Sequence, residues 1–310
     1  MARNWLADFK YEDGAWLVKK TGHRVPATKK LAHDIFTFLT FYTLAQSWRT
    51  WRRITGHKRP SIAFYPDKPR PWYFIWPVMH AAGAKIISDV SKADIVFQFD
   101  DSTKGDGVIP TTKSGAKLVN FGCNDISKSV VAAAFERAAG YSLAVDPRTY
   151  TGQMVEKSEM NAAHDGRIIE GPMEPLADKT YQVLVDNEIE GDLIEDLRAC
   201  ICGGVPAVTF RKRRAVGRRF LNENAEVILD TPENCYSPEE IEIITRFAAE
   251  IGLDWGGVDV LRDNASGKIY IVDANKTDMG PPIALELGDK LKATRRMAKA
   301  FVASFAPKRK

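Results

Sequence analysis

The sequence predicts an α+β protein with an N-terminal helical segment, a small open α/β domain and a larger C-terminal domain. Three observations support this fold class. Residues 29–53 contain no Gly or Pro and place apolar residues at helical spacing. After Pro60, short apolar runs alternate with helical stretches. Near the C-terminus, two apolar runs flank a turn at 264–267, which indicates a pair of antiparallel strands.

The bulk composition is that of a soluble protein with about two domains. The 310 residues suffice for a sizeable core, and 45% hydrophobic with 27% charged residues is ordinary for globular chains. No apolar run reaches the roughly eighteen residues that a spanning helix needs, and no secretory signal pattern begins the chain. The four cysteines form no Cys-x-x-Cys pair. We therefore expect a cytoplasmic protein without a disulfide framework.

Residues 1–59 form the first predicted unit, a helical segment with a strong positive charge. Residues 1–60 hold twelve Lys and Arg against four Asp and Glu, although the whole chain carries only +4. Two interpretations stay open for residues 29–53. The helix packs on the body of the protein, or it lies at the inner membrane face with Trp48, Trp51 and neighbouring arginines at headgroup level. No nucleic-acid partner is expected, because the basic residues do not continue into a groove-lining pattern.

Residues 60–124 form the second predicted unit, a small open α/β sheet. One helix is expected at 72–82, where Gly83 ends it, and residues 101–116 are expected to form a surface loop. The expected strands are 61–65, 85–88, 94–98 and 117–121.

Residues 125–310 form the third predicted unit. A helix is expected at 125–140, another follows the capping box of Ser237 and Glu240, and a last one runs from Pro282 to about Phe305. The expected strands are 153–157, 181–185, 197–202, 205–210, 226–229, 255–261 and 268–273.

The last strand pair carries the most informative cluster of polar residues. Asp259 lies on the first strand, and Asp273 and Asn275 lie two apart on the second, so the latter two share a face. Pairing of the strands can bring Asp259 onto that face as well. Two carboxylates and an amide oxygen are ligands suited to Mg²⁺. The alternative is that the two carboxylates pair with basic residues such as those at 211–219.

This stretch resembles the C-terminal end of ATP-grasp enzymes, in which an acid on one strand and an acid-x-Asn on the next hold Mg²⁺. The resemblance is to carboxylate–amine ligases of the type of the ribosomal-protein glutamate ligase and glutathione synthetase. It implies that Asp259, Asp273 and Asn275 are metal ligands, and that residues 125–310 form an ATP-grasp domain of two α+β lobes. The sequence departs from the family pattern in having Asp273 where Glu is most frequent.

Upstream residues follow the family's order. The run from Tyr181 resembles the strand that holds the adenine, which implies nucleotide contacts from Gln182, Val183, Leu184, Val185 and Asp186.

Basic residues complete the resemblance. Lys128 and Lys157 resemble the two nucleotide-contacting lysines, and a small-residue flap containing His164 and Asp165 follows Lys157. The family's Asp-x-Arg implies a catalytic role for Arg198. Arg211 and Arg213, in a basic run, are expected to clamp phosphates together with Arg198, unless that run is only a solvated loop.

The resemblance implies an ATP- and Mg²⁺-dependent ligase. Such an enzyme activates a carboxylate as an acyl phosphate and joins it to an amine or a similar nucleophile. Two alternatives stay open: a kinase of the same fold that phosphorylates a hydroxyl of a polyol or lipid-linked substrate, and a non-catalytic nucleotide-binding protein. The expected substrate is a small-molecule or lipid-linked anion.

Overall fold

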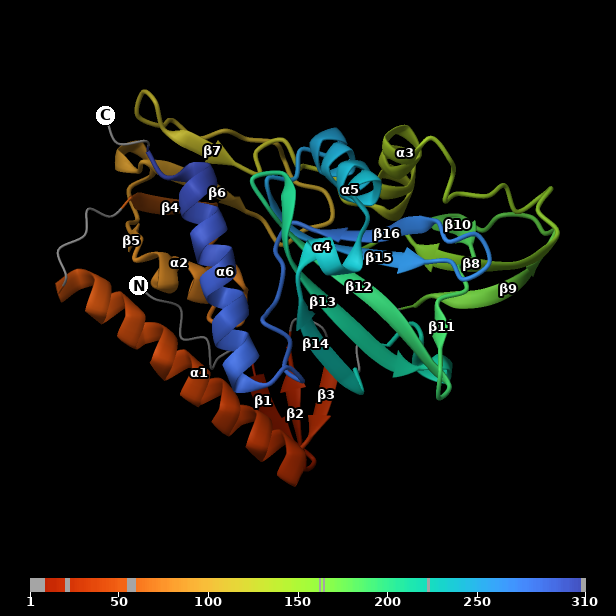
Figure 1. Ribbon diagram of the computed structural model, residues 1–310, viewed down its shortest axis with the longest axis horizontal. Helices are drawn as coiled ribbons and strands as arrows, with labels where there is room; N and C mark the ends of the chain where they lie inside the picture. Colours follow the sequence, from red (N-terminus) through yellow and green to blue (C-terminus); the bar gives the residue numbers. More distant parts are fainter. Residues whose placement is uncertain are drawn as a thin grey trace.

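The structure is a computed structural model that describes residues 9–19, 23–54, 60–161, 163, 165–221 and 224–307. In this part of the chain the strands form four sheets, and helices cover or flank them (Figure 1). None of the described helices has the length and apolar character needed to cross a membrane.

The N-terminal segment is only partly helical. Strands β1 (Phe9–Glu12), β2 (Ala15–Val18) and β3 (His23–Pro26) form an antiparallel sheet, and helix α1 (Lys29–Ile54) follows. The expectation of a helical segment is wrong for residues 9–18 and 23–26, which form these strands and the turn between the first two. Asp13 and Gly14 both have positive φ, 49° and 75°, as a two-residue hairpin turn requires. The Asp-Gly pair therefore directs the chain into a hairpin.

The expected open α/β sheet is confirmed. Its four strands are parallel in the order β5-β4-β6-β7. Helix α2 (Ile75–Ala82) begins three residues later than expected and ends at Gly83, whose φ is 70°. Residues 101–116 contain no helix and no extended strand, as expected. The strands are β4 (Ser61–Pro66), β5 (Lys85–Ile86), β6 (Ile95–Phe99) and β7 (Lys117–Val119).

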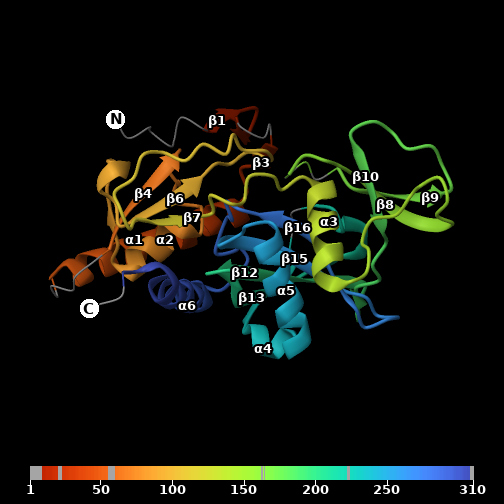
Figure 2. The same ribbon diagram turned by 90° about the horizontal axis from the view of Figure 1, so that it is seen from above.

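The next lobe contains helix α3 (Lys128–Ala139) and a three-stranded antiparallel sheet. Its strand order is β10-β8-β9. The strands are β8 (Gly152–Ser158), β9 (Arg167–Gly171) and β10 (Lys179–Val183). In the view from above, this sheet and the small parallel sheet lie at opposite ends of the molecule (Figure 2). Strand β9 had no counterpart among the expected strands.

The largest sheet carries the last lobe and is antiparallel throughout. Its order is β14-β13-β12-β15-β16, and the short β11 also pairs with β12. Strand β13 extends through the basic run to Ala215, which contradicts the alternative of a solvated basic loop for residues 211–214. The strands are β11 (Glu188–Ile189), β12 (Leu193–Cys202), β13 (Val205–Ala215), β14 (Glu226–Asp230), β15 (Trp255–Arg262) and β16 (Ile269–Asn275).

Three helices complete this lobe. They are α4 (Pro232–Cys235), α5 (Pro238–Glu250) and α6 (Leu287–Phe305). The capping box of Ser237 and Glu240 at the start of α5 is confirmed. Helix α6 begins at Leu287 rather than at Pro282.

The two faces of the large sheet differ, and the difference positions the site. Leu197, Ala199 and Ile201 of β12 point into an apolar core with α3 and α5. Residues at the alternate positions point to the other face, because side chains alternate along a strand. There, Cys200 and Cys202 are buried in a core with α2 and α6. Further along β12 the same face turns polar at Arg198 and Asp196.

Candidate active site

A polar cavity lies between the lobe of β8–β10 and the large sheet. Its wall combines residues of α3, β8, β10, β12, β13, β15 and β16 with the segment after β8 and the segment after β13. Its lining includes apolar side chains such as Val155, Val185 and Leu261. It also includes nine charged side chains: Lys128, Lys157, Asp165, Asp196, Lys212, Arg214, Arg219, Asp259 and Asp273. A ligand with an apolar ring and a polyanionic tail matches this composition.

Strand β13 contributes Lys212 and Arg214 to the cavity, whereas Arg211 and Arg213 face away from it. Both arginines hydrogen-bond to Glu195, with Arg211 Nη2 at 2.9 Å and Arg213 Nε at 2.8 Å from its carboxylate oxygens. The expectation that Arg211 and Arg213 act on phosphates is therefore wrong. The basic run was placed on the correct strand but on the wrong face, because a shift of one residue along a strand moves each side chain to the opposite face.

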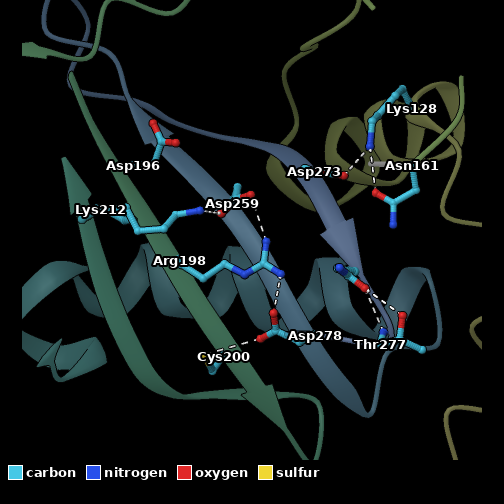
Figure 3. Close-up of polar contacts among 12 residues, drawn as sticks. Lys128, Asn161, Asp196, Arg198, Cys200, Lys212, Asp259, Asp273, Thr277 and Asp278 are labelled. Atoms are coloured by element: carbon cyan, nitrogen blue, oxygen red, sulfur yellow. Dashed lines mark hydrogen bonds and ion pairs between the residues drawn. The ribbon is translucent and has the colours of Figure 1, made fainter. Parts of the chain in front are cut away.

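Buried ion pairs join the floor of the cavity to the core (Figure 3). Arg198 donates to Asp259 at 2.9 Å and to Asp278 at 2.7 Å. Lys212 donates to the second oxygen of Asp259 at 2.8 Å. Burial alone raises the pKa of Asp259, but the charges of Arg198 and Lys212 overcome it and hold the pKa far below its usual range. Asp259 is therefore ionised at neutral pH. Arg198 does not line the cavity, and the catalytic role expected for it stays a prediction.

A glycine makes room for the ion pair between Arg198 and Asp278. A Cβ atom on Gly257 would lie 2.4 Å from Arg198 Nε and 2.7 Å from Asp278 Oδ2. These separations are shorter than any real contact of a Cβ atom, so a side chain here would displace the pair.

Asp273 lies in the same cavity as two lysines, Lys128 and Lys157. Asp273 accepts a hydrogen bond from Lys128 Nζ at 2.5 Å, and Lys128 also donates to Asn161 at 3.3 Å. Burial, opposed by Asp273 and reinforced by Lys128, lowers the pKa of Lys157 to about 8. Both lysines line the cavity, so the structure brings them together with Asp273 as the sequence predicted.

Two of the three predicted metal ligands line the cavity. Asp259 and Asp273 are register partners on β15 and β16, and both line the cavity. Asn275 shares their face, opposite Gly257, but it does not line the cavity. Its side-chain oxygen accepts from the backbone N–H of Thr277 at 2.9 Å. The described residues contain no cluster of three or more His, Cys, Asp or Glu suited to a metal.

The two carboxylates nevertheless fit Mg²⁺ in chemical type and placement. Mg²⁺ in nucleotide sites commonly uses one or two carboxylates together with substrate phosphates and water. Each carboxylate has about four lone-pair positions, so the ion pairs of Asp259 and Asp273 leave acceptor capacity.

Four of the five residues predicted to contact the nucleotide base line the cavity. They are Gln182, Val183, Leu184 and Val185. Asp186 does not line it: its carboxylate accepts from the backbone N–H of Glu188 at 3.2 Å and from Asn264 at 3.2 Å. The expectation of a nucleotide contact from Asp186 is thus unsupported by its position, because its side chain holds the adjoining loop.

Gln182 has a special position in the cavity wall. The residue is 1% exposed, and neither its amide nitrogen nor its amide oxygen has a hydrogen-bond partner among the described residues. Buried amides are usually satisfied, so an unpaired one at a cavity is suited to a polar ligand.

In the segment after β8, Asp165 is held by contacts with the ends of β8 and β10. Asp165 accepts from the Ser158 backbone N–H at 3.2 Å and from Lys179 at 2.7 Å. His164 lies outside the described residues.

Five charged residues of the site and its support had no individual role assigned from the sequence, although Asp196 lies in the Asp-x-Arg motif and three others lie in the basic run at 211–219. Alternation along β12 and β13 places Asp196, Lys212 and Arg214 on the face of Arg198, and this could have singled them out. The other two are in irregular segments: Arg219 lies beyond β13 and Asp278 beyond β16.

Comparisons with known proteins find similarity in structure but not in sequence. No family model matches the chain, and no curated protein matches it. The ATP-grasp ligase PsnB, solved with a phosphomimetic precursor variant, Mg and ADP, aligns with 14% identity and a TM-score of 0.52, over 79% of this chain and 98% of PsnB. PsnB with precursor peptide PsnA2 and AMPPNP aligns with 13% identity and a TM-score of 0.51, over 80% of this chain and 99% of PsnB.

A looser match is a RimK domain ATP-grasp protein from Sphaerobacter thermophilus. It has 11% identity and a TM-score of 0.47, and the alignment covers 80% of this chain and all of that one. The likeness to PsnB identifies the class: the chain has the ATP-grasp fold, in an α+β arrangement. The fold predicted from Asp259, Asp273 and Asn275 is therefore confirmed.

Proposed function

We propose that the chain is an ATP- and Mg²⁺-dependent ligase that activates a carboxylate as an acyl phosphate and joins it to an amine. The observation that carries this proposal is that Asp259 and Asp273, register partners on β15 and β16, line one cavity together with basic and apolar side chains. The fold supports the same conclusion, since the solved neighbours with this architecture are ligases.

The nucleotide would lie along the length of the cavity. Val155, Val183 and Leu261 would enclose the base, and the backbone at Gln182–Val185 would face its edge. Lys128 and Lys157 would contact the phosphates as compact charges. Asp259 and Asp273 would hold Mg²⁺, which neutralises phosphate charge and polarises the transferring group.

The chain's own residues would then organise the transfer. Lys212 and Arg214 point into the cavity from β13 and would stabilise charge on the γ-phosphoryl group. A carboxylate oxygen of the substrate attacks the γ-phosphorus, and the bond to the ADP oxygen breaks. The amine then attacks the acyl carbon and displaces phosphate, while its proton passes to solvent. Arg198, held between two carboxylates, positions Asp259 rather than reacting itself.

The proposed substrate is a peptide carboxylate. PsnB is solved with precursor peptides, which favours a peptide over the lipid-linked anion considered from the sequence. No structural observation favours the kinase alternative, which remains an outcome of the test.

Product analysis with ATP, Mg²⁺ and candidate peptides tests the proposal. The proposed ligase yields ADP, free phosphate and a new amide in equal amounts. A phosphorylated acceptor without free phosphate would indicate a kinase, and AMP with pyrophosphate would contradict both.

Matched variants test the site. Asp259→Asn and Asp273→Asn should each lower turnover about 10²-fold or more, as for loss of a group that stabilises transition-state charge. Asp106→Asn, in the loop at 101–116 outside the cavity, is the control and should leave turnover unchanged. Full turnover in both site variants would contradict the metal-binding role of the two carboxylates, and ATP binding by the wild type without any turnover would favour a non-catalytic nucleotide-binding protein.

A further inference from the structure

Helix α1 lies along the outside of the molecule (Figure 1), and among the described residues one of its sides packs on α2 and α6. Phe41 and Ala45 are 3% and 0% exposed on the inner side. Tyr42 stacks on Trp76 of α2, with ring centroids 4.9 Å apart, and Arg295 of α6 lies over the ring of Trp48 at 5.0 Å. The interpretation of a helix packed on the body is therefore confirmed for this side.

The opposite side of α1 is apolar although it faces outward. Between Ile35 and Ile54, ten described side chains are exposed, and Arg49 is the only charged one among them. Helix α6 differs, because Lys292, Arg295, Arg296 and Lys299 are all exposed on it. We call the following residues the outer face of α1: Ile35, Phe36, Leu39, Leu44, Trp51 and Ile54, which are 45%, 70%, 48%, 37%, 67% and 73% exposed.

The hydroxyl groups between these residues are turned onto the helix itself. Thr40 donates to the Phe36 carbonyl at 2.9 Å, and Thr43 donates to the Leu39 carbonyl at 2.8 Å. Ser47 does the same to the Leu44 carbonyl at 2.6 Å. Hydroxyls bonded to the preceding turn present their methyl or methylene groups outward. The outer face therefore meets its surroundings as a nearly continuous apolar strip.

The charges that flank the strip decide what it binds. Lys29 and Lys30 are exposed at the start of α1, and Arg49 is exposed near its end, next to Trp48, over whose ring Arg295 lies. The only acidic residue in the helix is Asp34. Two copies of α1 would bring basic residues together whether they paired parallel or antiparallel. An anionic surface complements both ends at once.

We propose that the outer face of α1 binds the surface of an anionic lipid bilayer, with the helix lying in the membrane plane. Apolar side chains would enter the boundary between headgroups and acyl chains, and the flanking Lys and Arg would contact lipid phosphates. The protein would bind without crossing the bilayer, in agreement with the absence of a spanning helix in the described chain. The proposal is independent of the ligase activity, because no residue of α1 lines the cavity.

Vesicle co-sedimentation tests the proposal with the full chain. Vesicles of phosphatidylcholine alone are compared with vesicles of phosphatidylcholine and phosphatidylglycerol in equal parts. The wild type should sediment with the anionic vesicles only. The double variant Phe36→Ser, Ile54→Ser should bind at least about tenfold more weakly than the wild type, because each of the two apolar side chains buries area in the lipid. Lys29→Gln should weaken binding about fivefold.

The matched control makes the same chemical change elsewhere. Ile109→Ser and Ile283→Ser replace exposed side chains, 58% and 69% accessible, that lie off α1 and should leave binding unchanged. Equal binding by wild type and the Phe36/Ile54 variant, or no binding of wild type to anionic vesicles, would overturn the proposal. So would a wild-type dimer in gel filtration that the double variant converts to a monomer, since a second copy would then cover the strip.

Discussion

Gly257 lies directly beneath Arg198, so a Cβ atom at this position would come within 2.4 Å of Arg198 Nε. We predict that Gly257→Ala displaces Arg198 from Asp259 and Asp278, costs about 1–3 kcal/mol of unfolding free energy, and lowers turnover. Urea unfolding and steady-state kinetics measure the two effects. Gly288→Ala is the control, because a Cβ atom there meets nothing within 4 Å. Unchanged kinetics in Gly257→Ala would show that the Arg198 pairing does not serve the site.

Adjacent residues of β13 should differ sharply in their effect on activity. Lys212 lines the cavity and pairs with Asp259, whereas Arg211 pairs with Glu195 on the other face. Lys212→Met should lower turnover about 10²-fold or more, and Arg211→Met should leave it within a few-fold of wild type. ADP release under saturating ATP measures both. A larger loss in Arg211→Met than in Lys212→Met would reverse the assignment of the two faces.

Gln182→Met should have opposite effects on stability and on binding. The buried amide of Gln182 has no hydrogen-bond partner among the described residues, so an apolar side chain of similar shape should keep or raise the stability of the ligand-free protein. The same change should weaken ATP binding by about 1–3 kcal/mol, because a bound base would lose a polar partner. Thermal unfolding measures the change in stability, and calorimetric titration with ATP measures the change in affinity. Lower stability combined with unaltered affinity would contradict the role of this amide.

Nucleotide affinity should fall as the pH rises through about 8. The pKa of Lys157 is lowered to about 8, chiefly by burial, so its positive charge is lost above that pH in the ligand-free protein. A bound phosphate favours the charged form, so ATP binding near this pH should take up a proton. Titrations in two buffers of different ionisation enthalpy measure the uptake. In Lys157→Arg the uptake should vanish, because arginine stays charged.

His80 should make the protein sensitive to acid. Burial beside Trp76 and the charge of Arg49 lower its pKa to about 4, and its Nε2 has no hydrogen-bond partner in the described structure. The unfolded chain binds the proton at a higher pH, so stability is full above the unfolded pKa and is lost as the pH falls towards 4. His80 should therefore contribute a loss of about 2 kcal/mol between about pH 7.5 and about pH 5.

Urea unfolding of His80→Leu at the same two pH values isolates this contribution. The variant lacks the titrating group, so its stability should fall by correspondingly less than that of the wild type. An equal fall in both proteins would assign the acid sensitivity to other groups.

Local patterns in the sequence predicted many elements correctly, for identifiable reasons. The capping box at Ser237 and the glycine at 83 act within one turn of helix, so they can be read without tertiary contacts. The hairpin at Asp13 and Gly14 is equally local, because an Asp-Gly pair favours a two-residue turn. The late start of α6 was not predictable from Pro282, because packing on the core decides where that helix begins.

The sequence by itself determined the fold class and the order of the site's strands. Strand alternation placed Asp273 and Asn275 on one face, and the turn at 264–267 paired their strand with that of Asp259. Only the tertiary structure decided which of these side chains reaches the cavity. It turned Lys212 inward and Arg211 outward, engaged Asn275 with Thr277, and set Asp278 beside Arg198. The reason is physical: period and capping are properties of neighbouring residues, whereas the face and depth of a charge depend on distant strands that pair with it and bury it.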